Sequence, residues 1–212
     1  EGDVEQIVLP NGATLVLQPD SRLPNVHVRL AHRGGPLYER AGKRGATALL
    51  ATMLTKDTRR RSAAETAKWI EEVGGSFYPF SGNNSFGLAV EVLPTDLDRA
   101  LAVVRDAALT PAFRAATFER EREAQLAELQ QDADDVVTLG RKRVREKFFG
   151  AHPLALDASG DEEGVRALRP ADLMALHREL VVAPNTVLSI AGLHYLPLAE
   201  VVQRIESTAH DY

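Results

Sequence analysis

The distribution of apolar and polar positions divides the chain into short strands and longer helices. Over Val26–Arg33 apolar residues alternate with more polar ones, which is typical of a strand with one buried face. Other short runs rich in β-branched residues predict strands over 5–9, 14–18, 76–81, 85–93 and 185–192. An Asn-Gly pair between the first two of these runs favours a hairpin.

Apolar residues that recur every three or four positions predict helices in the rest of the chain. The expected helices cover 45–58, 62–73, 95–109, 115–132, 136–149, 171–180 and 198–205. Ser62 and Glu65 have the spacing of a capping box at the start of the second helix. Residues 150–168 are rich in Gly, Pro and Asp and predict a loop.

Strands and helices come in clusters along the chain and do not alternate strictly. This order predicts an α+β fold, with a mainly antiparallel sheet and helices packed on one face. No internal repeat, low-complexity segment or shift in composition marks a linker, so residues 1–212 are expected to form a single domain.

Composition excludes several classes of function. The formal net charge of −5 argues against a nucleic-acid partner, because phosphate binding requires a basic surface. The chain has no cysteine, which excludes disulfides, thiolate zinc sites and cysteine nucleophiles. No apolar run approaches the roughly 18 residues of a membrane span.

The helix expected over 45–58 has two different faces. One is an apolar stripe that contains Leu49 and Met53. The other carries Ala48, Ala51 and Thr52, with nothing that ionises or binds a metal. Such small side chains would let a neighbouring helix approach closely.

A set of motifs, in order along the chain, resembles one family. They are Leu9-Pro10-Asn11-Gly12, Arg33 to Glu39, Gly45 to Thr58, Glu72 to Phe77, Phe118 to Glu123, His152-Pro153-Leu154 and Asn185 to Gly192. Together they resemble the first structural half of a subunit of the insulinase, pitrilysin and mitochondrial processing peptidase family of zinc peptidases.

The resemblance implies one half of a clamshell. Two such halves normally form a subunit, and two subunits or tandem copies enclose the substrate. We therefore expect the second half to be absent from this chain, which starts at Glu1 without a Met and ends soon after the last predicted helix. Bacterial members are commonly exported, so the resemblance implies a periplasmic location.

The resemblance also identifies what the 45–58 helix lacks. Active members carry an inverted His-x-x-Glu-His motif, whose two His bind zinc while the Glu acts as general base. Those three positions fall on Ala48, Ala51 and Thr52. The third ligand of the family, a Glu on the distal helix, falls on Glu128, and a second acidic position falls on Glu121. A solvated or salt-bridged helix residue is the alternative interpretation of Glu128.

The strand after Gly74-Gly75 departs from the family pattern as well. Active members pair this strand with the extended substrate, and here it reads Tyr78-Pro79-Phe80-Ser81. Pro79 has no N–H and cannot donate to an added strand. Alternatively, it only protects a sheet edge from unwanted pairing.

The remaining polar motifs give no metal site. No two histidines have ligand spacing, and His177, among leucines of a predicted helix, is expected to be packed. The basic run Lys56 to Arg61 is interpreted as a solvent-facing loop, with a patch for an acidic partner as the alternative.

Three functions remain open. The first is a non-catalytic subunit without a cofactor of its own, which pairs with an active zinc peptidase subunit or tandem domain, or with itself. The second is a metalloendopeptidase with unorthodox ligands. The third is a stand-alone module that binds a peptide or a partner protein.

Overall fold

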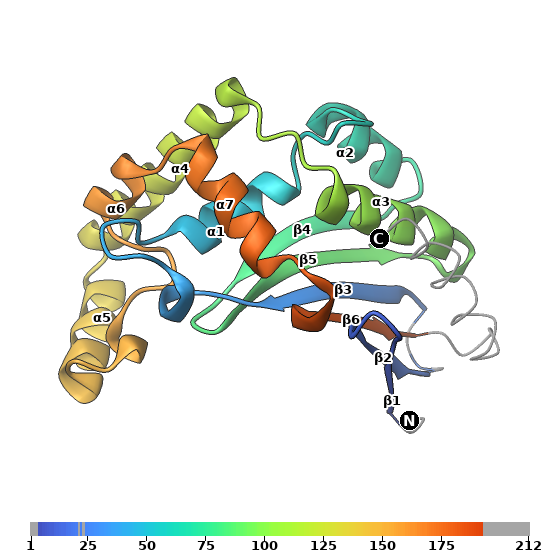
Figure 1. The fold of residues 1–212 in the computed structure, drawn as a ribbon, viewed down its shortest axis with the longest axis horizontal. Coiled ribbons are helices and arrows are strands. Elements are labelled where there is room, and N and C mark those ends of the chain that lie inside the picture. Colours follow the sequence, from blue (N-terminus) through green and yellow to red (C-terminus); the bar gives the residue numbers. More distant parts are fainter. Residues whose placement is uncertain (1–3, 21, 23, 193–212) are drawn as a thin grey trace.

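The computed structural model describes residues 4–20, 22 and 24–192, and contains one mixed sheet covered by helices on one face (Figure 1). The strands are β1 (Glu5–Val8), β2 (Thr14–Gln18), β3 (Val26–Arg33), β4 (Ser76–Ser81), β5 (Ser85–Val92) and β6 (Thr186–Ala191). The helices are α1 (Ala46–Leu54), α2 (Ala63–Glu71), α3 (Leu97–Leu109), α4 (Ala115–Asp134), α5 (Val136–Phe149), α6 (Glu162–Ala167) and α7 (Pro170–Leu180).

The six strands follow the order β1-β2-β6-β3-β5-β4. Every neighbouring pair is antiparallel except β2 and β6, which run parallel. The predicted α+β class, with a mainly antiparallel sheet and helices on one face, is therefore confirmed. Strand β6, the last in the described chain, pairs with β2 on one side and with β3 on the other. It therefore joins the β1–β2 hairpin to the strands β3, β5 and β4.

Two clusters of buried side chains form the core. One lies between the sheet and α3 and includes Val28, Val90 and Leu101. The other surrounds α1 and contains residues of α4, α7 and β5, among them Phe86 and Phe118. The alternation expected along β3 places Val26, Val28, Leu30 and His32 on the buried face.

Two helix predictions differ from the structure. The helix expected over 45–58 ends at Leu54, because the buried side chain of Asp57 binds the amide of Ala63 (3.1 Å) and the hydroxyl of Thr117 (2.6 Å). These bonds turn the chain out of the helical path towards α2.

The loop expected over 150–168 contains the short helix α6. Asp161 caps it by accepting a hydrogen bond from the amide of Gly164 (2.7 Å), and Val165 is fully buried. A helix of six residues is too short for its periodicity to be recognised. The helix expected over 198–205 lies outside the described residues.

None of the helices in the described part of the chain is long and apolar enough to cross a bilayer.

Candidate functional site

Helix α1 begins at a buried carboxylate. Glu39, only 8% exposed, accepts hydrogen bonds from the amides of Gly45 (2.9 Å) and Thr47 (2.7 Å). Gly45 has a φ of 91°, and a Cβ there would clash with the carbonyl of Ser159. The negative charge at the positive end of the helix dipole stabilises α1. The sequence does not predict this role, because a carboxylate seven residues before the first residue of the helix carries no recognisable capping signal.

Ala48, Ala51 and Thr52 lie on α1 in the predicted helical arrangement. Ala51 is 1% exposed and belongs to the core cluster around Phe86 and Phe118, whereas Ala48 and Thr52 are half-buried. The face of α1 that carries these three residues is therefore less exposed than the polar face of an amphipathic surface helix. Neither alanine has a ligand atom, and a lone hydroxyl is a poor zinc ligand beside imidazole. Within the described residues, no group of three or more His, Asp or Glu side chains is arranged to bind a metal ion.

Helix α4 lies antiparallel to α1 and is tied to both of its ends. The Thr117 hydroxyl donates to Asp57 just beyond the C-terminal end of α1 (2.6 Å). The Gln125 amide donates to the carbonyl of Gly45 at the N-terminal end (3.1 Å). These two bonds fix the position of α4 along the axis of α1.

Glu121 and Glu128, both on α4, consequently lie near opposite ends of α1. Glu121 is 12% exposed in its side chain and pairs with Lys56 (3.3 Å) and Arg120 (2.9 Å). Glu128 is exposed, lies about one turn beyond Gln125, and has no ion pair among the described residues. The assignment of Glu128 to the third ligand position stays a prediction.

The basic run Lys56 to Arg61 is partly used inside the molecule. Lys56 pairs with Glu121, as described above. Arg61 pairs with the buried carboxylate of Asp106 (3.0 Å), and its guanidinium lies 3.8 Å from the centre of the Trp69 ring. Arg60 reaches the same carboxylate at 3.6 Å while staying 55% exposed. Lys56 and Arg61 thus tie α4 and α3 to the segment after α1, whereas Arg59 and Arg60 are exposed to solvent. A patch for an acidic partner stays a prediction.

Strand β4 lies at the edge of the sheet, next to α1. The amide of Gly82 donates to the carbonyl of Ser85 (2.8 Å) just beyond β4. Bonded and non-bonded pairs alternate in an antiparallel ladder, so Pro79 and Leu88 form a non-bonded pair. The backbone of Pro79 therefore faces the open edge, where it offers a carbonyl but no donor.

Tyr78 and Phe80 point to the face of the sheet away from α1, because side chains alternate along a strand and Phe77 packs against the core. The Tyr78 hydroxyl donates to Glu91 on β5 (2.8 Å), a bond that raises the pKa of the phenol. The Phe80 ring lies under the Arg29 guanidinium at 4.7 Å. Ser81 ends the strand beside the turn to β5. The segment from Tyr78 to Ser81 is thus held in the sheet. The row of backbone N–H donors along its open edge is interrupted at Pro79.

The described histidines do not form a metal site either. His32 is 2% exposed beside Phe86, and its Nδ1 lies 3.1 Å from the hydroxyl of Thr186. His177 is half-buried, binds the carbonyl of Ala108 (2.7 Å) and has a pKa lowered by burial. The packed role expected for His177 is what the structure contains.

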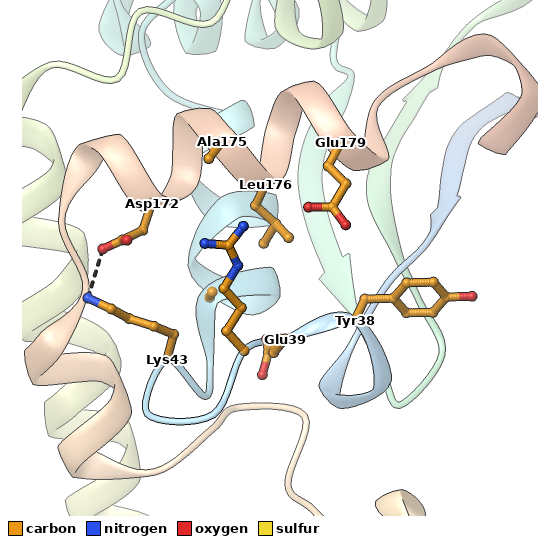
Figure 2. Close-up of a pocket in the computed structure, with 9 residues that line it drawn as sticks. Tyr38, Glu39, Lys43, Asp172, Ala175, Leu176 and Glu179 are labelled. Atoms are coloured by element: carbon orange, nitrogen blue, oxygen red, sulfur yellow. Dashed lines mark hydrogen bonds and ion pairs between the residues drawn. The ribbon is translucent and has the colours of Figure 1, made fainter.

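Two hollows lie near α1. A groove of about 550 Å³ separates α2 from the start of β4; its lining includes Ala63, Ala64, Ala67, Ser76 and Phe77. A smaller pocket of about 120 Å³ lies between the loop before α1 and helix α7 (Figure 2). There Lys43 is bound to Asp172 (2.9 Å), with Leu176 and Glu179 further along α7. Its Lys43–Asp172 pair fastens the loop to α7.

Comparison with known proteins places this geometry in a family. The family model described as insulinase (peptidase family M16) matches residues 14–162. An uncharacterized zinc protease of Rickettsia bellii is 25% identical over 184 residues, which cover 87% of this chain and 45% of the relative.

Two solved structures share the fold. The peptidase M16 inactive domain from Pseudomonas fluorescens superposes with a TM-score of 0.86 at 20% identity, covering 98% of this chain and 50% of that one. The periplasmic protease PqqL from Escherichia coli gives a TM-score of 0.88 at 15% identity, covering 99% of this chain and 24% of that one. The chain thus spans half or less of these proteins.

The matched residues include α1, the edge strand β4 and helix α4, the three elements on which the predicted site residues lie. The sequence resemblance to the first half of a subunit is therefore confirmed. The chain belongs to the insulinase family of peptidases, peptidase family M16.

Proposed function

We propose that this chain is a non-catalytic half of a family M16 peptidase, which forms one wall of a chamber around a peptide substrate. The zinc and the general base reside on a partner subunit or tandem domain. The wall consists of α1, the edge strand β4 and the groove between α2 and β4. The observation that carries the proposal is the set Ala48, Ala51 and Thr52 on α1, where a metallopeptidase needs two imidazoles and a carboxylate.

The packing around α1 supports a structural role. Ala51 is 1% exposed inside a cluster of Phe, Leu and Met side chains, where an ionised glutamate would require desolvation. The half-buried carboxylate of Glu121 on α4 is already engaged by Lys56 (3.3 Å). The helix that carries catalysis in active members acts here as part of the hydrophobic core.

The edge of β4 also favours the proposal, because it can contact a peptide but does not align the peptide for cleavage. Pro79 interrupts the donors that an added strand would use. The neighbouring groove has room for side chains of a peptide and is lined largely by small residues. This groove also favours a second candidate function, that of a stand-alone peptide-binding module.

The location follows from the same proposal. A structural neighbour is a periplasmic protease. The absence of cysteine is compatible with an oxidising compartment, because no thiol is exposed to oxidation. On this proposal the chain and its active partner meet in the periplasm.

The test is co-expression with a family M16 chain from the same genome that carries an intact His-x-x-Glu-His. We expect the two chains to copurify and the pair to cleave an unstructured peptide. Replacing a zinc ligand of the partner should abolish cleavage, whereas Glu128→Gln in this chain should leave it unchanged. Cleavage by this chain alone, removed by a chelator, would refute the proposal. Peptide binding by the chain alone, without copurification, would favour the stand-alone module.

A further inference from the structure

Opposite charges line the pocket between the loop before α1 and helix α7 (Figure 2). Its lining includes two cations, Arg40 and Lys43, and three carboxylates, Glu39, Asp172 and Glu179. None of its lining residues lines the groove between α2 and β4. The chemistry of this pocket is therefore separate from the proposed function.

Three of these five charged side chains have partners within the protein. Lys43 pairs with Asp172 (2.9 Å), and Glu39 accepts two hydrogen bonds from amides at the start of α1. In the part of the chain that the structure describes, Arg40 and Glu179 form no ion pair, either with each other or with a third residue. One cation and one anion of the lining are therefore free to bind a ligand.

The two free charges come from opposite walls of the pocket, with an apolar floor between them. Arg40 belongs to the loop, whereas the Glu179 carboxylate extends from α7 towards the loop (Figure 2). Leu176, one turn before Glu179 on the same side of α7, is 9% exposed, and Ala46 at the start of α1 is 5% exposed. The pocket thus presents a cation, an apolar surface and an anion within a small space.

The walls of the pocket are held in place by contacts that leave the free charges unused. Lys43 fastens the end of the loop to α7, through Asp172 and through the carbonyl of Ala167. The Arg44 guanidinium donates to the carbonyl of Pro36, which braces the loop across its own turn. The backbone of the loop is therefore fixed before a ligand binds, and binding would cost little conformational entropy of the loop.

The free charges and the size of the pocket define the ligand. A guanidinium binds a carboxylate through two parallel hydrogen bonds, and a carboxylate accepts hydrogen bonds from an ammonium group. A simple anion would be repelled by Glu179 and a simple cation by Arg40, so a molecule that carries both charges is favoured. The volume of about 120 Å³ is well below the roughly 300 Å³ at which pockets for drug-sized ligands begin. The ligand is therefore a small zwitterion.

We propose that this pocket binds a free α-amino acid with a short apolar side chain. The carboxylate of the amino acid pairs with Arg40, its ammonium group pairs with Glu179, and its side chain lies over Leu176. The Lys43–Asp172 pair closes one end of the pocket. Because Arg40 and Glu179 are exposed, solvent screens both contacts, and we expect a dissociation constant of about 1 mM.

The experiment is a titration of the whole chain with L-alanine, followed by the amide resonances in NMR spectra at physiological ionic strength. We expect saturable shifts confined to residues 38–46 and 172–179. Acetate and methylammonium carry one charge each and should bind at least tenfold more weakly than alanine. L-Tryptophan exceeds the volume of the pocket and should produce no saturable shift of these residues.

Substitutions separate the two charged contacts. Arg40→Gln and Glu179→Gln should each weaken alanine binding about tenfold, and both residues are exposed, so the fold is kept. Arg178→Gln, at the exposed neighbour of Glu179 outside the lining, is the matched control and should leave the affinity unchanged. Alanine methyl ester has no carboxylate and should lose no affinity when Arg40 is replaced.

Three results would each overturn the proposal. The first is the absence of saturable alanine binding, or shifts that map outside the pocket. The second is an affinity for acetate or methylammonium as high as that for alanine. The third is unchanged alanine binding in folded Arg40→Gln and Glu179→Gln, since a site that does not use these two charges would behave in this way.

Discussion

The buried histidine of β3 gives the most quantitative prediction. His32 is 2% exposed, packs on Phe86, and burial lowers its pKa from 6.5 to about 4, with a smaller contribution from His177. The hydroxyl of Thr186 already donates to the carbonyl of Val182 (2.8 Å), so Nδ1 of His32 donates to Thr186. Its Nε2 has no hydrogen-bond partner. Burial outweighs the backbone of Asn185, which favours the protonated ring, and the folded protein therefore holds the imidazole neutral.

The magnitude follows from linkage between protonation and folding. Unfolding returns the imidazole to water, where the ordinary pKa of 6.5 applies. Above that pH both states are neutral and the contribution of His32 to stability is fully present. As the pH falls from 6.5 towards 4, the unfolded state binds the proton first, and stability is lost. A difference of this size corresponds to about 3 kcal/mol, at 1.36 kcal/mol per pH unit.

The assay is urea unfolding followed by circular dichroism between pH 7.5 and about 4. In His32→Asn the amide nitrogen occupies the place of Nδ1, and the cavity lowers stability equally at every pH. The unmodified chain should therefore lose about 3 kcal/mol more than His32→Asn across this range. Leu30→Ala, at a 3% exposed residue on the same face of β3, is the matched control: it leaves a cavity but keeps the imidazole, and should keep the full pH dependence. Parallel profiles for the unmodified chain and His32→Asn would refute the reasoning.

Three further predictions concern the surroundings of α1. Asp106→Ala leaves Arg60, Arg61 and Arg105 without their 3% exposed carboxylate and should cost about 3 kcal/mol. A melting temperature lowered by less than about 2 °C would contradict this. Glu39→Ala should cost about 2 kcal/mol by calorimetry, and Glu39→Gln about half as much, because the amide keeps one acceptor; equal losses would argue against a role for the charge. Ala48→His with Thr52→His should create a zinc site with a dissociation constant of about 1 μM by titration calorimetry. Adding Glu128→Gln should weaken that site about tenfold, whereas weakening by Glu121→Gln alone would move the third ligand position to Glu121.

Most of the fold was predictable because its signals are local. The alternation along β3, the Asn-Gly hairpin and the Ser62–Glu65 capping box each depend on residues close in sequence. Helix α6 was missed because six residues are too few to display a period. The early end of α1 was missed because Asp57 turns towards Thr117, a residue on a distant helix.

At the candidate site, the sequence predicted only which residue types stand at the three positions of the family motif on α1. The sequence places Ala48, Ala51 and Thr52 on one helix, but not the burial of Ala51 or the pairing of Lys56 with Glu121. Nor does it reveal that Glu39 holds the N-terminal end of α1. These contacts join segments far apart in the chain, and spacing along the sequence carries no information about them.

The central claim, that this chain binds no catalytic zinc of its own, is tested most directly by measuring its metal content. The purified chain is incubated with micromolar free zinc, dialysed, and analysed by elemental analysis, with calorimetric titration in parallel. The account predicts sub-stoichiometric zinc and no saturable binding, because α1 presents Ala48, Ala51 and Thr52 in place of ligands. One zinc retained per chain, and lost in Glu128→Gln, would contradict it.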